Sequence, residues 1–187
     1  MNTILILLSL ALWGLVHSIL ASHFAKDMVK SPRFYRLGYN LFAAISFLPV
    51  MYLVAVLPDA PLYQVPAPWS YVMRGVQALS ALLLVVALLQ TDTLSFVGLR
   101  QLFEEEKPGQ LVTRGLYKLV RHPLYTFSLF FIWFSPTVSQ NSLVFYLGVT
   151  LYVFIGAYFE ERKLLRDFGE AYAGYKEKTP FLIPGFK

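Results

Sequence analysis

The sequence has no cysteine and few charged residues, and each shortage excludes classes of protein. Without cysteine there is no disulfide scaffold, no iron–sulfur cluster held by thiolates and no thiolate nucleophile. Charged residues make up 14% of the 187, against roughly 25% in soluble domains. Low charge combined with 57% apolar residues excludes a disordered chain. Because a chain of this size cannot bury so much apolar surface inside itself, the composition predicts a membrane protein.

The sequence also lacks the short motifs of several large enzyme classes. It contains no Walker A loop, no G-x-G-x-x-G after a strand and no H-E-x-x-H zinc motif. It contains no G-x-S-x-G, the motif that presents a serine nucleophile on a sharp turn. We therefore expect neither a bound metal nor a serine triad.

Five apolar runs predict an all-α integral membrane protein of about five transmembrane helices. A helix needs about 20 apolar residues to cross the hydrocarbon layer, and the fourth run is shorter than the others. Turn-forming residues separate the last two runs, so we expect those two helices to form a tight hairpin. The runs cover residues 2–21, 37–57, 71–91, 124–138 and 141–159.

The basic residues predict the orientation of these spans. Fifteen of the 16 Lys and Arg lie in three segments, residues 22–36, 92–123 and 160–187. With five spans these segments share one side of the membrane, and by the positive-inside rule that side is cytoplasmic. We therefore expect the N-terminus outside and the C-terminus inside. Within one domain, residues 1–91 would form a three-helix scaffold, and residues 92–187, which mix apolar runs with long polar segments, are where we look for chemistry.

Arg121, His122 and Pro123 stand at the start of the fourth run. Proline suits the first position of a helix, where its missing N–H costs nothing. The N-terminal end of a helix dipole favours anions, so the arginine and histidine are candidates for holding an anionic group. Ordinary membrane topology, with a basic residue beside a helix start, accounts for the same residues.

Glu160 and Glu161 end the fifth run, where carboxylates are less routine than cations. Ionisable groups at membrane depth usually face protein or water and serve a function. Alternatively, the helix continues beyond them and Glu–Arg pairs along its surface solvate it. The following residues, 164–175, have the spacing of an amphipathic interfacial helix. Residues 179–184 are apolar and extended, and we expect them to dock back on the protein.

Together these motifs resemble the C-terminal half of the isoprenylcysteine carboxyl methyltransferase and phospholipid methyltransferase superfamily. The resemblance covers residues 111–184. In the N-terminal half, His17-Ser18 and Tyr35-Arg36 resemble the bacterial NnrU-like or methanethiol S-methyltransferase-like branch. The C-terminal motifs are Gly115-Leu-Tyr117, Arg121-His-Pro-Leu-Tyr125, Glu160-Glu161, and Gly169 with Tyr172 and Tyr175 before a proline-bearing end.

The resemblance implies a membrane enzyme that uses S-adenosylmethionine in a site built from the last two spans and the tail. It implies catalytic roles for Arg121 and Glu161, with one glutamate at the cofactor and the other near the substrate. Phe181 stands where the family end often carries an arginine, so no contact of that arginine carries over. The implied cofactor-binding residues are Gly115, Tyr117, Arg121, His122, Tyr125, Glu160, Glu161, Tyr172 and Tyr175.

The methyl acceptor stays open at this point, among isoprenylated protein, phospholipid amine, small thiol and hydrophobic metabolite. Membrane lipids are the expected partners, and nucleic acid is not, because topology explains the net charge of +5. Two other functions fit the sequence. A haem- or quinone-binding membrane protein would use His17 and His122 as ligands. An assembly factor would retain the fold without catalysis.

Overall fold

The computed structural model describes residues 2–29, 32–104 and 109–185 of the chain. Lys30, Lys107 and Lys187, which belong to the basic segments, lie outside the described residues. In chain order the helices are α1 (Asn2–Ala21), α2 (His23–Asp27), α3 (Pro32–Val56), α4 (Trp69–Leu89), α5 (Thr93–Val97), α6 (Pro123–Trp133) and α7 (Gln140–Lys178). Two 3-10 turns, η1 (Arg100–Leu102) and η2 (Gly115–Lys118), and two strands, β1 (Pro61–Gln64) and β2 (Thr137–Ser139), complete the elements.

The chain forms two compact units, each built from three separate stretches of sequence. The first unit contains Met1–Leu62, Thr93–Pro108 and Val138–Val149, and the second contains Tyr63–Asp92, Gly109–Thr137 and Thr150–Lys187. The two short strands, where the chain passes between units, pair in a two-stranded sheet that the sequence did not predict.

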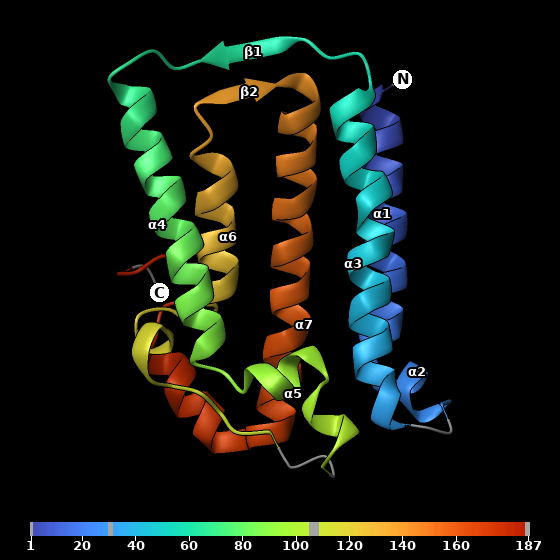
Figure 1. Cartoon of the computed structure of the whole chain (residues 1–187). Coiled ribbons are helices and arrows are strands. Elements are labelled where there is room, and N and C mark those ends of the chain that lie inside the picture. The colour runs from blue at the N-terminus through green and yellow to red at the C-terminus, as the bar shows by residue number, and fades with distance from the viewer. Residues whose placement is uncertain (1, 30–31, 105–108, 186–187) are drawn as a thin grey trace. The chain divides into compact units, whose positions relative to one another are not determined.

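In the first unit α1 and α3 lie side by side (Figure 1). Ile6 and Leu10 of α1 pack with Val50 and with Phe145 at the start of α7, and all four are buried. Polar groups also join the two helices. The hydroxyl of Tyr39 and Nε2 of His17 lie 2.6 Å apart, so this intramembrane histidine makes the interhelical hydrogen bond expected for polar groups in such segments.

In the second unit α4 and α6 are antiparallel neighbours (Figure 1). The amide of Gln77 donates to the carbonyl of Phe131 over 2.8 Å. Beyond α6 the chain is extended, and the N–H of Val65 donates to the carbonyl of Pro136, also over 2.8 Å. The segment from α6 to Pro136 therefore runs the length of α4, although only part of it is helical.

Helix α7 covers 39 residues and consists of two helical stretches that meet at a kink at Gly169. The first stretch carries the fifth apolar run and both glutamates, so the helix continues past Glu161, as one of the two alternatives predicted. The expected interfacial helix, residues 164–175, is not one helix, because the kink at Gly169 interrupts it. At Gly169 the backbone leaves helical values (φ 51°, ψ −128°), a region essentially restricted to glycine. After this residue the last part of α7 turns across the axis of the part before it (Figure 1).

Among the described residues, four helices are long and apolar enough to cross a membrane: α1, α3, α4 and α7. The expected fourth span is the exception, because α6 has 11 residues. At 1.5 Å per residue that is about 16 Å, roughly half of the hydrocarbon thickness. Proline at its first position and the serine–proline pair after it set these bounds. The protein is thus a helical integral membrane protein with four full-length candidate spans and one half-length helix.

Candidate active site

The start of α6 is shaped by the three residues predicted to open it. Pro123 occupies the first helical position, and His122 before it has a non-helical backbone (φ −124°, ψ 65°). The backbone N–H of Arg121 donates to the carbonyl of Pro180 over 2.8 Å. His122, which is buried, therefore lies between a residue that is hydrogen-bonded to the tail and the first residue of α6.

Glu161 is the centre of a charged cluster next to this helix start. Its Oε1 accepts from Nε of Arg121 at 2.6 Å, and its Oε2 lies 2.6 Å from Nζ of Lys176. Nε2 of His122 lies 3.4 Å from the same Oε1. The side chains of Arg121 and Glu161 are only 9% and 10% exposed, so their charges depend on one another for compensation.

Lys176 is the member of this cluster that sequence reasoning missed. It lies fifteen positions after Glu161 in the same helix. In an unbroken α-helix that separation is about 22 Å along the axis. The break at Gly169 returns the lysine to the carboxylate, and the only sequence signal for this was the glycine itself.

The segment after α7 docks back on the protein, as the sequence predicted, and its partners lie at the start of α6. The expected extended conformation is not found, because residues 181–183 form bends and residues 184–185 a turn. Nη1 of Arg121 donates to the carbonyl of Thr179 at 2.6 Å and to that of Lys176 at 3.2 Å. The hydroxyl of Thr126 donates to the carbonyl of Leu182 at 2.7 Å. The ring of Phe181 lies edge-on to His122, with centroids 5.3 Å apart, and the Arg121 guanidinium lies over it at 5.3 Å. The residue that departs from the family pattern therefore covers the histidine with an apolar ring.

The two glutamates occupy different environments. The Glu160 side chain is 44% exposed, whereas that of Glu161 is 10% exposed. Glu160 accepts a hydrogen bond from the Tyr125 hydroxyl at 2.7 Å and lies 3.7 Å from Nδ1 of His122. Its remaining surface is open to a ligand, whereas the oxygens of Glu161 already contact protein cations.

Burial determines the protonation state of His122, which lies between the two glutamates. Desolvation lowers the pKa of His122, and this outweighs the opposing effect of the Glu160 and Glu161 carboxylates, which raise it. The imidazole is accordingly neutral near pH 7, since its pKa lies below the ordinary value of about 6.5.

A second group of predicted residues gathers around the turn η2. Gly115 begins the turn with φ +61°, and the N–H of Leu116 donates to Oε1 of Gln90 at 2.8 Å. A Cβ at position 115 would lie only 2.4 Å from that same oxygen. The glycine is therefore required both by the backbone angle and by the close approach of Gln90, which follows the end of α4.

Two tyrosines of α7, Tyr172 and Tyr175, lie near this turn, and one of them is hydrogen-bonded to it. The Tyr175 hydroxyl donates to the carbonyl of Tyr117 at 2.5 Å. The Tyr172 ring lies 5.9 Å from that of Tyr175, and its buried hydroxyl meets no partner at hydrogen-bonding geometry among the described residues. Burial, reinforced by the nearby Glu160 charge, raises the pKa of Tyr117 to about 12, so this phenol stays protonated at neutral pH.

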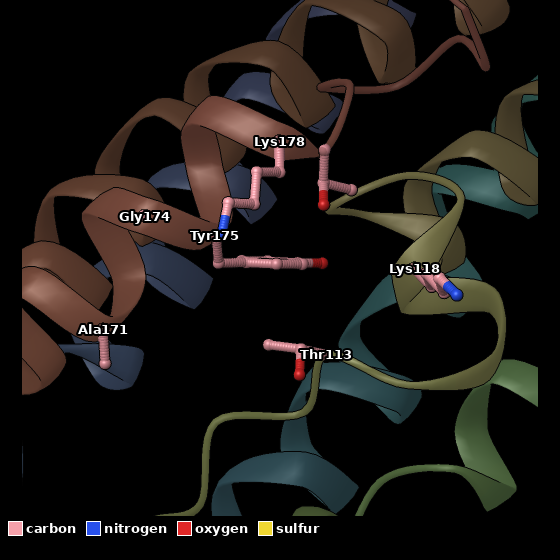
Figure 2. Close-up of a pocket in the computed structure, with 7 residues that line it drawn as sticks. Thr113, Lys118, Ala171, Gly174, Tyr175 and Lys178 are labelled. Carbon is pink, nitrogen blue, oxygen red and sulfur yellow. The ribbon is translucent and has the colours of Figure 1, made fainter.

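A hollow of about 520 Å³ lies between the end of α7 and the loop that leads into η2. Figure 2 shows the Tyr175 ring projecting from the helix toward the loop that carries Thr113 and Lys118. Of the predicted cofactor residues only Tyr175 lines this hollow, and the others lie in the Glu161 cluster or around η2. The lining residues are Thr113, Lys118, Ala171, Gly174, Tyr175, Lys178 and Thr179.

The second unit therefore brings the predicted site residues together in two linked groups. The first group is Arg121, His122, Tyr125, Glu160 and Glu161, and the second is Gly115, Tyr117, Tyr172 and Tyr175. Within residues 2–29, 32–104 and 109–185, no three His, Asp or Glu side chains lie close enough to hold a metal ion.

Comparison with known proteins finds a family match over a range that includes most of this site. The family model described as "Phospholipid methyltransferase" matches residues 72–171, a range that extends from α4 through both glutamates. The chain belongs to this family.

Several related proteins align with nearly the whole chain. Methanethiol S-methyltransferase 2 of Bradyrhizobium diazoefficiens is 30% identical over 95% of this chain and 71% of its own length. Methanethiol S-methyltransferase 1 of the same organism is also 30% identical, over 95% of this chain and 65% of its own length. Methanethiol S-methyltransferase of Mycobacterium tuberculosis is 26% identical, over 95% and 76%. No solved structure matches the chain.

Proposed function

We propose that this protein is an S-adenosylmethionine-dependent membrane methyltransferase whose acceptor is a small thiol. The observation that carries the proposal is the arrangement of Glu160, His122 and Tyr125 beside the Arg121–Glu161 pair, inside the region that matches a methyltransferase family. The names of the relatives, aligned over 95% of the chain, favour methanethiol or a similar thiol as the acceptor.

The residues present fit the groups that S-adenosylmethionine carries. When bound, this cofactor supplies a methyl group activated on a sulfonium sulfur. The open oxygens of Glu160 suit a cationic group, and the phenol rings of Tyr125 and Tyr175 suit a cation or an aromatic base. Burial and the nearby Glu161 carboxylate raise the pKa of the Tyr172 phenol, so this hydroxyl is a neutral polar group at the edge of the Glu161 cluster.

Arg121 and Glu161, expected to be catalytic, would act mainly by positioning. Their side chains bind each other, Lys176 and the carbonyls of the tail, which fixes the walls around His122 and Glu160. Methyl transfer requires the reacting groups to be held in line, so such rigidity contributes through proximity. A thiol acceptor also releases a proton, and the exposed Glu160 carboxylate beside the neutral His122 ring is the base we assign to accept it.

The proposal is tested with the full chain purified in detergent. Supplied with S-adenosylmethionine and methanethiol, it should release dimethyl sulfide, which gas chromatography detects in the headspace. Phosphatidylethanolamine is offered in a parallel reaction with labelled cofactor. Labelled lipid without dimethyl sulfide would overturn the choice of acceptor. Absence of S-adenosylmethionine binding in calorimetry on folded protein would overturn the methyltransferase itself.

The alternative functions are less well supported by the contacts of the histidines. His17 is hydrogen-bonded to Tyr39, and His122 lies between two glutamates under Phe181. Both rings thus already have partners that compete with a haem iron. A Soret band in the purified protein would favour haem binding, and cofactor binding without any methylated acceptor would favour an assembly factor.

We propose the orientation that the basic residues predict, with the C-terminus in the cytoplasm of a bacterial cell and the chain in the inner membrane. In the second unit the path from α6 to Pro136 returns the chain to the opposite end of α4, as a fifth span would. On this reading residues 92–187 supply the cofactor-binding region at the cytoplasmic interface and residues 1–91 support it.

A further inference from the structure

The exposed face of α7 changes from apolar to basic within a few residues. Leu151, Ile155 and Phe159 are 62%, 48% and 61% exposed. Arg162, Lys163 and Arg166 continue the same face at helical spacing. The buried residues Val153, Ala157 and Glu161 lie on the opposite side of the helix.

The basic part of this face is hollowed. Phe159, Arg162, Lys163 and Arg166 line a depression of about 430 Å³. One lining residue is aromatic and the other three are cations. The guanidinium of Arg162 lies 5.8 Å from the centroid of the Tyr158 ring, which fixes that arginine beside the apolar segment.

The three cations are incompletely neutralised by the protein. Arg166 has an ion pair with the adjacent Asp167 at 3.3 Å, and both side chains are exposed. In the described part of the chain no carboxylate pairs with Arg162 or Lys163. The depression therefore presents net positive charge immediately beyond an apolar surface that needs acyl chains around it.

We propose that this face of α7 is a binding site for an anionic phospholipid. The acyl chains lie along Leu151, Ile155 and Phe159, and the headgroup phosphate lies among Arg162, Lys163 and Arg166. A lipid is the occupant because only a molecule with both parts matches a continuous apolar and basic face. The site is separate from the Glu161 cluster and does not depend on the methyltransferase proposal.

The test uses the full chain in detergent, with dioctanoyl phosphatidylglycerol as the probe. A ligand that binds the folded state raises the melting temperature with increasing concentration, which gives an apparent dissociation constant. Phosphatidylglycerol should raise it and dioctanoyl phosphatidylcholine should not. The triple variant R162Q/K163Q/R166Q should weaken phosphatidylglycerol binding on the order of 100-fold, because each cation near a headgroup contributes independently. The matched control R33Q/R74Q/R114Q removes the same charge elsewhere and should retain binding.

Three results would overturn the proposal. The first is a triple variant that binds phosphatidylglycerol as tightly as the parent. The second is a control variant that loses binding to the same extent, which would reveal a response to overall charge alone. The third is equal stabilisation by glycerol 3-phosphate, which would indicate a soluble phosphate site. If the triple variant does not fold, the single variants R162Q and K163Q should each weaken binding severalfold, and R162K/R166K should preserve it.

Discussion

Glu160 and Glu161 are neighbours in sequence but meet different surroundings, because adjacent positions of a helix point about 100° apart. Glu161 faces Arg121 and Lys176 in the protein, whereas Glu160 faces outward beside Tyr125. The paired sequence motif therefore contains one residue that holds the site together and one that is open to a ligand.

Replacing each glutamate with glutamine should separate these roles. Glu161→Gln leaves the buried Arg121 without its counter-charge, and we expect a loss of about 3–5 kcal/mol in the free energy of unfolding. Glu160→Gln should keep the parent melting temperature and weaken S-adenosylmethionine binding by about 10–100-fold, the value of one hydrogen bond to a charged group. Differential scanning fluorimetry and calorimetry make the two measurements. Equal loss of stability in both variants would contradict the assignment.

His122 should make stability depend on pH. Its pKa is lowered in the folded protein by burial, so below about pH 6.5 the unfolded chain binds more protons than the folded one. The contribution is present at pH 7–8 and is lost as the pH falls below 6.5 toward the lowered value. Melting temperatures should therefore decline between pH 7 and 5.5, and His122→Asn should reduce that decline. Parallel profiles for parent and variant would show that other groups are responsible.

At the scale of elements, two glycines determine how the site is assembled. Gly115 lets η2 approach Gln90 at the end of α4, and Gly169 turns the end of α7 back toward Glu161. Both have positive φ, but only Gly115 also has a side chain pressed against it.

Gly115→Ala should be the more damaging of the two substitutions. The left-handed conformation costs about 1–2 kcal/mol for a residue with Cβ, and the clash with the Gln90 amide adds to it. Combining it with Gln90→Ala should recover part of the loss, which a double-mutant cycle of melting measurements quantifies. Gly156→Ala is the control, because nothing lies within 4 Å of a Cβ there. Strict additivity of the two changes would refute the steric explanation.

Gly169→Ala should act through the backbone alone. Nothing lies within 4 Å of a Cβ at this position, so the cost is that of its unusual angles, about 1–3 kcal/mol. If the helix straightens instead, Lys176 leaves Glu161. Spin labels at Arg162 and Lys178 should then report a longer separation than in the parent, and an unchanged distance with unchanged stability would contradict the role given to this glycine.

The sequence was sufficient for the elements that depend on apolar length. The first predicted span, residues 2–21, has the bounds of α1, because an uncharged run followed by serine defines both ends. The sequence was insufficient where tertiary contacts determine the bounds of an element or the partners of a side chain. The apolar run 124–138 contains no charge to mark where α6 stops, and its last residues form a strand instead. Gln90 stands where a polar residue is expected, at the end of an apolar run, but its bond to Leu116 depends on the tertiary fold. Lys176 reaches Glu161 only because the helix breaks at Gly169, and the glycine was the only local signal of that break.

At the scale of the whole molecule, the distribution of charge predicts how the protein is inserted. A green fluorescent protein fused to the C-terminus should fluoresce, and alkaline phosphatase at the same point should be inactive, since the basic segments are expected in the cytoplasm. Phosphatase inserted after Val65, in a segment without Lys or Arg, should be active. The reverse pattern would contradict the orientation and would place the site on the outer face.

Besides the ring of Phe181, the hydrogen bonds between the tail and the start of α6 use the main chain of the tail. Arg121 contacts the carbonyls of Lys176, Thr179 and Pro180, and Thr126 contacts that of Leu182. A carbonyl is present whatever the side chain, so mutations in the tail can accumulate over evolution while these bonds persist. The family match ends at residue 171, before this segment begins. We therefore expect that distant members can share this docking of the tail even where their sequences no longer align, and comparison of backbone paths is the way to find it.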